Sequence, residues 1–148
     1  MEGQPLDSCE FHAGELLLRL ETTVRADHAE AEALVDRIME TVTGMGCAAG
    51  KEWEIRLALE EALLNAIEHG CGGDPAKEVQ CSVLCDRERG MLIVVRDPGP
   101  GFDPASVPSP IVGQNLYAAR GRGIYLINQL VDQVRFERGG TEIHMRVK

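Results

Sequence analysis

Three polar side chains recur at helical spacing within an otherwise apolar stretch, "RLALEEALLNAIEHG", at residues 56–70. On a helix, Glu61 and Asn65 lie one turn apart and differ in direction by about 40°, so their side chains adjoin. Glu68 continues the same row. A carboxylate can accept a proton and a carboxamide oxygen can bind a cation, but a solvated helix face would show the same pattern. The row must therefore face solvent or line a cleft.

An acidic residue follows a run of apolar residues in "VVRDPGPGF", at residues 94–102. Asp97 comes directly after this run, and Gly99 and Gly101 follow at alternate positions. An aspartate at a Pro-Gly turn is a common structural arrangement. The same carboxylate can also accept a hydrogen bond from a ligand, so both interpretations are open for this stretch alone.

Residues 119–127, "ARGRGIYLI", place Gly121 and Gly123 at the start of a helical pattern. The first turn of a helix has free N–H groups that can hold phosphate oxygens. A lone Gly-x-Gly is more often just a loop and a cap. The chain contains no Gly-Lys-Ser/Thr sequence, so it is not a P-loop protein.

The expected strands and helices place these three stretches in one domain. Hydrophobic periodicity predicts, in order, a strand at 15–24, a helix at 26–46, a helix at 51–69, strands at 77–89 and 91–99, a helix at 121–133, and a hairpin at 134–148 that turns at Gly139 and Gly140. This order predicts an α/β fold, a two-layer sandwich of a mixed sheet with helices packed on one face. Residues 1–14 show no periodicity and are expected to be a loose arm before the domain at 15–148.

The composition excludes several classes of protein. The chain has 148 residues and a net charge of −9, from 24 acidic and 15 basic residues. Broad binding to a nucleic-acid backbone requires a basic surface, so we expect no direct nucleic-acid contact, whereas a basic protein partner is compatible. The first 18 residues contain no Lys or Arg, and the longest conspicuous apolar run is "MLIVV". We therefore expect neither a signal peptide nor a membrane span, and a cytoplasmic location.

The five cysteines have no metal-type spacing. A reducing cytosol would keep all of them as thiols. Cys81 and Cys85 share one face of a predicted strand about 13 Å apart, too far for a direct disulfide or a shared metal. We therefore interpret both as buried thiols.

The three stretches, in this order, resemble the N box, the D-x-G-x-G box and the second glycine box of the Bergerat ATP-binding fold. That superfamily includes the DNA gyrase B subunit, histidine kinases, mismatch-repair ATPases and chaperones of the ninety-kilodalton class. "EEALLNAIEHG", the compact size and the short segment between the glycine boxes resemble the anti-sigma-factor serine/threonine kinases in particular. The resemblance covers about residues 15–147, nearly the whole chain.

The resemblance implies ATP and Mg²⁺ as cofactors, and a role for each matching residue. Mg²⁺ takes few protein ligands because nucleotide phosphates supply negative charge, so the neutral amide oxygen of Asn65 is the expected metal ligand. Glu61 matches the general base that takes the proton of a serine hydroxyl or a water. Asp97 matches the aspartate that accepts a hydrogen bond from the adenine amine, and Gly99 and Gly101 would admit close approach of the nucleotide.

A long loop separates the last two motifs. Five of the seven prolines fall between Pro98 and Pro110, and loops of this kind are usually kept for function. The resemblance implies a lid at about 103–120, and the phosphates would lie at Gly121 and Gly123. Two nearby cations are candidates for phosphate or partner contacts, namely Arg120 and Arg122.

The resemblance implies an ATP-dependent serine/threonine protein kinase. Such kinases sequester a sigma factor and phosphorylate an anti-anti-sigma partner, which resembles a small sulfate-transporter-and-anti-sigma (STAS) domain. The implied role is in transcription regulation and the stress response, and a homodimer is possible. One alternative is a nucleotide-gated binding module that transfers no phosphate. A lower-ranked alternative is a detached histidine-kinase ATP-binding domain, because we find no preceding helical pair with a phospho-accepting histidine.

Overall fold

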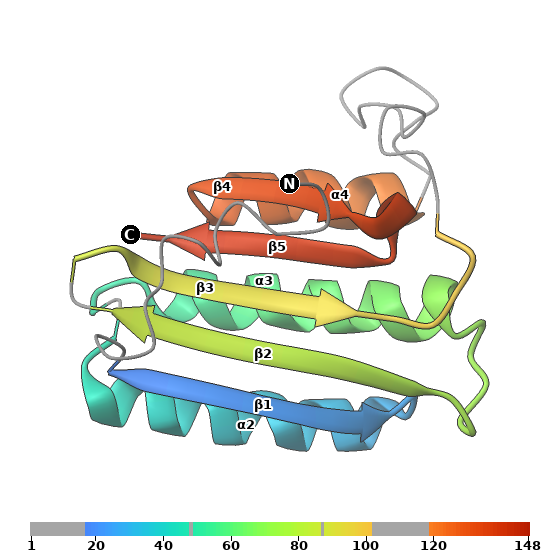
Figure 1. Ribbon diagram of the computed structural model, residues 1–148, viewed down its shortest axis with the longest axis horizontal. Helices are drawn as coiled ribbons and strands as arrows, with labels where there is room; N and C mark the ends of the chain where they lie inside the picture. Colours follow the sequence, from blue (N-terminus) through green and yellow to red (C-terminus); the bar gives the residue numbers. More distant parts are fainter. Residues whose placement is uncertain (1–16, 48, 87, 102–118) are drawn as a thin grey trace.

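The computed structural model describes residues 17–47, 49–86, 88–101 and 119–148 (Figure 1). The predicted N-terminal arm at 1–14 lies outside these residues, as does the expected lid up to residue 118. The elements follow in the order β1 (Leu18–Arg25), α2 (His28–Met45), α3 (Glu52–Asn65), η2 (Ala66–Gly70), β2 (Glu78–Asp86), β3 (Gly90–Arg96), α4 (Ala119–Leu130), β4 (Gln133–Glu137), η5 (Arg138–Gly140) and β5 (Glu142–Val147).

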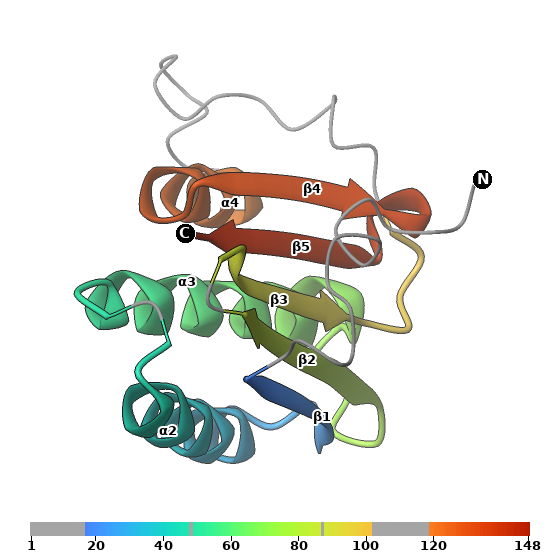
Figure 2. The ribbon, with the colours of Figure 1, turned by 60° about the vertical axis from the view of Figure 1, so that its left-hand side comes forward.

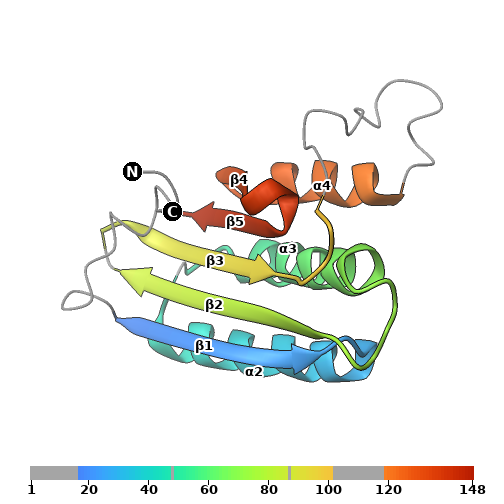
Figure 3. The ribbon, with the colours of Figure 1, turned by 45° about the vertical axis from the view of Figure 1, so that its right-hand side comes forward.

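The chain forms the predicted α/β sandwich, with a five-stranded sheet of order β1-β2-β3-β5-β4. The three α-helices of the described residues lie on one face of the sheet, with α3 between α2 and α4 (Figures 2 and 3). The prediction of a mixed sheet is wrong, because each of the four strand pairings is antiparallel. β3 and β4 do point the same way, as expected for strands joined by one helix, but β5 lies between them and is antiparallel to both.

The core lies between the sheet and the helices. Alternate residues of β2, β3 and β5 face the helices, as the period of a strand requires. α2 and α3 contribute apolar stripes at helical spacing. The largest fully buried apolar side chains include Leu34, Ile38, Ile55, Leu59, Leu63, Ile93 and Met145.

Helix α2 begins and ends with the signals that its sequence carries. The Asp27 carboxylate caps the N-terminus by accepting a hydrogen bond from the Ala29 N–H at 3.3 Å. Gly46 ends the helix in the left-handed region, at φ +73°, where a side chain would be strained. The predicted helix at 26–46 is therefore confirmed to within two residues.

Helix α3 does not continue as a regular α-helix to residue 69, the end that the sequence predicts. It continues into a π-helical turn, η2, in which the Cys71 N–H donates to the Ala66 carbonyl at 2.8 Å. Cys71 keeps a right-handed conformation, and the first glycine after this turn with a positive φ is Gly72. Such turns occur frequently at functional sites. Here the wider turn brings Gly70 against the end of β3.

Helix α4 begins two residues before the predicted start at 121 and ends three residues before the predicted end at 133. It ends at Leu130, because the sheet binds the chain that follows: the Asp132 N–H donates to the Arg146 carbonyl at 2.9 Å, and Gln133 starts β4. Helical periodicity at Ile127, Leu130 and Val131 extends beyond the helix, since it does not detect this pairing. Pairing with β5 therefore fixes the end of the helix.

The prediction that all cysteines are thiols is wrong for two of them. Cys47, just after α2, and Cys85, in β2, form a disulfide with a Cα–Cα distance of 6.3 Å. Their separation of 38 residues hides this proximity in the sequence. Cys81 is a buried thiol as predicted, and burial raises its pKa to about 12. Burial, followed by the charge of Asp97, also raises the pKa of the Cys71 thiol.

Across the part of the chain that the structure describes, none of the helices combines the length and the apolar character needed to cross a membrane.

Candidate functional site

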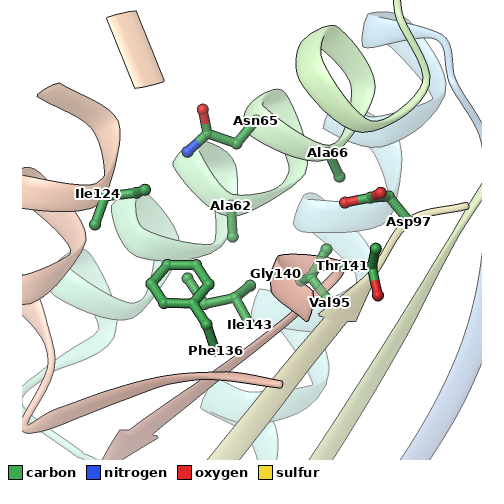
Figure 4. A pocket seen from close by; sticks show the side chains of 10 residues that line it. All are labelled: Ala62, Asn65, Ala66, Val95, Asp97, Ile124, Phe136, Gly140, Thr141 and Ile143. Atoms are coloured by element: carbon green, nitrogen blue, oxygen red, sulfur yellow. The ribbon is translucent and has the colours of Figure 1, made fainter. Parts of the chain in front are cut away.

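A cavity lies between α3, α4 and the ends of β3, β4 and β5 (Figure 4). It contains about 360 Å³ of unfilled space, including the part open to solvent. Its polar lining residues are Asn65, Asp97 and Thr141. The rest of the lining is apolar or glycine: Ala62, Ala66, Val95, Ile124, Phe136, Gly140 and Ile143.

Asn65 lies at one end of this cavity, on the last turn of α3. Its side chain and that of Glu61 both contact α4 at Gly123. A Cβ on Gly123 would lie 3.0 Å from Asn65 Nδ2 and 3.1 Å from Glu61 Oε1. Gly123 therefore lets α4 approach the two polar side chains, and this gives the predicted Glu61–Asn65 row a defined neighbour.

The Glu61 carboxyl is half-buried, and its pKa is raised above the ordinary value of 4.5. The largest cause is burial, followed by the negative charges of Glu60 and Glu68. Glu68 does not line the cavity. It lies on η2, where its Oε2 is 3.9 Å from His28 Nε2. A carboxylate whose pKa is moved toward neutrality is suited to proton transfer.

Asp97 lies at the other end of the cavity, directly after β3. Its N–H donates to the Thr141 carbonyl at 2.9 Å, which continues the β3–β5 ladder by one residue. Its Oδ1 accepts a hydrogen bond from the Gly99 N–H at 2.8 Å. The backbone thus fixes both the position of Asp97 and the direction of its carboxylate, which points into the cavity (Figure 4).

Thr141 lies beside Asp97, and the sequence analysis missed it. Its Oγ1 donates to the Arg138 carbonyl at 2.9 Å, and its side chain lines the cavity (Figure 4). The register that pairs Arg96 with Glu142 brings Thr141 opposite Asp97. The sequence does show a threonine directly after the glycines of the closing hairpin, but the register is needed to relate it to Asp97.

Three glycines allow backbone segments to meet around Asp97. A Cβ on Gly70 would lie less than 3.0 Å from the Asp97 side chain, and a Cβ on Gly99 would collide with the backbone of Gly70. A Cβ on Gly101 would collide with the carbonyl of Gly139, and Gly101 also has a φ of +78°. Gly99 and Gly101 thus permit close contacts within the protein's own backbone, and the approach of a nucleotide expected at them stays a prediction.

A charged cluster lies on the opposite face of the sheet from the helices. Glu142 alternates with core residues of β5 and pairs with Arg96, with Arg138 at 2.9 Å, and with His144 Nε2 at 2.9 Å. Although they lie on this face, Glu142 and His144 are only 1% and 2% exposed. The Arg96–Glu142 pair bridges the residues next to Asp97 and Thr141 in the chain, so it holds these two positions together.

Burial alone would raise the pKa of Glu142. The hydrogen bond with His144 and the positive charge of Arg96 outweigh this effect and lower the pKa below its ordinary value of 4.5. The carboxylate is therefore ionised in the folded protein at neutral pH, where it needs its cationic partners.

The structure brings together most, but not all, of the predicted site residues. Asn65 and Asp97 line one cavity, Glu61 adjoins Asn65, and Gly123 packs against both side chains of the α3 row. Gly99 packs on the backbone of Gly70 and Gly101 on that of Gly139, and neither is among the described residues that line the cavity. Three other predicted residues, Arg120, Gly121 and Arg122, lie in the first turn of α4, and their side chains fall outside the described residues.

The chemistry of this cavity fits an adenine nucleotide. Asp97 supplies an acceptor for an exocyclic amine, and the hydroxyl of Thr141 keeps lone pairs after donating to Arg138. Ile124 and Phe136 supply apolar surface for a purine ring. At the other end, the Asn65 carboxamide offers a neutral oxygen of the kind that completes a Mg²⁺ shell rich in water and phosphate.

Comparison with known families supports this fit. A family model described as a histidine kinase-like ATPase domain matches residues 24–147, which includes every described element except β1, of which it covers the last two residues. No curated protein gives a significant match to the chain.

Substitution of Gly70 by Ala tests the packing around Asp97. We expect Gly70→Ala to lower the free energy of unfolding by about 1–3 kcal/mol, because the new methyl group overlaps the Asp97 side chain. Gly44→Ala is the matched control. Gly44 lies in α2 with nothing within 4 Å of the added Cβ. The free energy of unfolding of this variant should therefore rise by about 0.5–1 kcal/mol. Urea denaturation measures both, and equal effects would contradict the packing argument.

The charged cluster predicts a pH dependence of stability. Because the pKa of Glu142 is lowered in the folded state, its contribution is present above the unfolded value near 4.5 and is lost as the pH falls through the folded pKa. Glu142→Gln should therefore lower the free energy of unfolding by about 1–3 kcal/mol at neutral pH. On acidification, the free energy of unfolding of this variant should fall less than that of the parent.

Denaturation at a series of pH values measures this effect. Glu78→Gln serves as the control, since Glu78 is exposed at the start of β2. If the stability of Glu142→Gln falls with acid in parallel with the parent, Glu142 does not carry the dependence.

Proposed function

The chain belongs to the histidine kinase-like ATPase domain family, and on this basis we propose that it is an ATP-dependent serine/threonine protein kinase of the anti-sigma-factor type. The observation that carries the proposal is the position of Glu61. Its carboxyl, with a raised pKa, adjoins Asn65 at the end of the cavity opposite Asp97. A nucleotide with its base at Asp97 would extend its phosphates toward this pair.

Asp97 and Thr141 would bind the adenine. The Asp97 carboxylate accepts a hydrogen bond from the exocyclic amine, whereas the carbonyl of a guanine at that place would be repelled. The hydrogen bonds of Asp97 to the Gly99 N–H and to the Thr141 carbonyl set this acceptor in place before the ligand arrives. The protein is therefore expected to prefer ATP over GTP.

Asn65 would bind Mg²⁺ through its amide oxygen. The metal ion would neutralise charge on the phosphates and help to orient them. Gly99, Gly101, Gly121 and Gly123 border the nucleotide in this proposal, and Arg120 and Arg122 remain candidates for phosphate contacts.

Glu61 would act as the general base. It accepts the proton of a serine or threonine hydroxyl as the hydroxyl oxygen bonds to the γ-phosphorus. Burial keeps the pKa of Glu61 above that of an ordinary surface glutamate, which makes its carboxylate a stronger base. Because Gly123 has no side chain, helix α4 packs closely beside the Glu61 carboxyl.

The partners follow from the resemblance to anti-sigma kinases. We propose a STAS-type anti-anti-sigma protein as the phosphate acceptor and a sigma factor as the protein that is sequestered. The net charge of −9 is compatible with a basic segment on a partner and not with direct nucleic-acid binding. Homodimer formation stays a prediction.

A nucleotide-gated binding module without phosphoryl transfer is the main alternative. In this alternative the same cavity would bind ATP, and the bound nucleotide would change a partner surface without a chemical step. The Glu61 carboxyl favours the kinase, because a module has no need of a base beside the phosphate end. A histidine-kinase ATP-binding domain would instead form an acid-labile phosphate on a histidine.

Substitution of Glu61 by Gln separates the kinase from the binding module. We expect Glu61→Gln to lower phosphoryl transfer at least about 100-fold, because the amide cannot accept the proton, while ATP affinity changes little. The parent rate should rise with pH through a pKa above 4.5, and the variant should lack this dependence.

The measurement uses γ-labelled ATP, Mg²⁺ and a purified STAS-type protein from the same genome. Glu54→Gln is the matched control, since Glu54 lies on the same side of α3 two turns before Glu61. Acid-stable label on a partner serine or threonine supports the kinase. A tight complex that never acquires label supports the module, and acid-labile label supports the histidine kinase.

A further inference from the structure

A second groove lies in the helical layer, between α2 and α3. It contains about 980 Å³ of unfilled space, including its open side. The first two turns of α2 and the second half of α3 form its walls, and these helices run side by side (Figures 1 and 2). This groove does not share its lining with the nucleotide cavity, which lies toward α4.

Glu61 connects the groove to the nucleotide cavity. Glu61 is one of the residues that line the groove, and its Oε1 lies at the contact with Gly123 next to Asn65. A hydroxyl group in the groove can therefore reach Glu61 from the side opposite the nucleotide. This arrangement separates the path of the acceptor from the place of ATP, as a transfer between two bound substrates requires.

We propose that this groove receives the partner segment that carries the acceptor serine or threonine, and that this segment is basic. The inference rests on the proposed kinase function and specifies its substrate. The hydroxyl oxygen forms a bond to the γ-phosphorus, the bond between that phosphorus and the bridging oxygen of ADP breaks, and the hydroxyl proton passes to Glu61.

The charge of the groove supports a basic segment. Glu32 of α2 and Glu60 and Glu61 of α3 supply three carboxylates, whereas His28 is the one basic side chain among the described lining residues. Arg56 lies 3.4 Å from Glu60 and offsets part of this charge. Lysine or arginine residues beside the acceptor hydroxyl would meet opposite charges, and an acidic segment would be repelled.

The apolar walls supply a place for one side chain of the segment. Val35, Leu63 and Ile67 form the deep part of the groove and are almost completely buried. Leu64 is half-buried and is the more accessible apolar contact. We therefore expect the acceptor segment to combine basic residues with one apolar residue that packs on Leu64.

Charge reversal at Glu32 tests this proposal with two synthetic probes. One is a serine peptide flanked by lysines, and the other is the same peptide with glutamates in place of the lysines. The full chain is saturated with Mg²⁺ and a non-hydrolysable ATP analogue, and binding is measured by fluorescence anisotropy. Glu32→Lys should lower the affinity for the lysine peptide about fivefold and raise the affinity for the glutamate peptide.

Glu40→Lys is the matched control. Glu40 is also exposed on α2, but it lies two turns beyond Glu32 and outside the groove. It should leave the affinity of both peptides close to that of the parent. The free energy of unfolding of the two variants, from urea denaturation, should match that of the parent. NMR shift changes caused by the lysine peptide should occur at groove residues such as Leu64.

The outcomes separate this inference from the proposed function. With ATP in place of the analogue, Glu32→Lys should raise the KM for the lysine peptide about fivefold and leave kcat unchanged. If the peptide is labelled but Glu32→Lys and Glu40→Lys behave alike, the groove proposal fails and the kinase stands. If it binds in the groove but is never labelled, docking stands and the kinase fails. Equal binding of both peptides, or no saturable binding of the lysine peptide, overturns the groove proposal.

Discussion

The contact between the end of α3 and the end of β3 is the constraint on which the site depends. Gly70 has no Cβ, and the side chain of Asp97 occupies the space where one would lie. Gly99 in turn packs directly on the backbone of Gly70. Because α3 also carries Asn65, this contact fixes the distance between the two polar ends of the cavity. The π-helical turn provides the extra residue that brings Gly70 to this position.

The central position of α3 lets one helix serve two surfaces. One side packs on α4 through Gly123, where Glu61 and Asn65 adjoin, and the other side forms the groove with α2. Glu61 belongs to both, and its burial there, together with neighbouring acids, raises its pKa. On the opposite face of the sheet, the Arg96–Glu142 pair supports the strand ends that hold Asp97 and Thr141. Electrostatics and backbone packing therefore act on the same cavity from opposite sides of the sheet.

Local patterns were sufficient to predict most of the elements, since their boundaries are set by nearby residues. Asp27 and Gly46 bound α2, and the strand periods of β2 and β3 decide which side chains face the helices. The candidate site residues Glu61, Asn65 and Asp97 could be selected from the sequence because each lies in a short motif. Thr141 was missed because its relation to Asp97 depends on strand register, which joins residues 44 positions apart in the chain. The Cys47–Cys85 disulfide, the insertion of β5 between β3 and β4, and the early end of α4 depend on tertiary contacts in the same way.

A crystal structure of the full chain with Mg²⁺ and a non-hydrolysable ATP analogue tests the central claim most directly. The account predicts that the exocyclic amine of adenine donates to the Asp97 carboxylate, with the ring against Ile124 and Phe136. It also predicts that Mg²⁺ binds the amide oxygen of Asn65 and that the γ-phosphate lies near Glu61. A nucleotide bound outside this cavity, or one whose base lies at Asn65 and whose phosphates lie at Asp97, would contradict it.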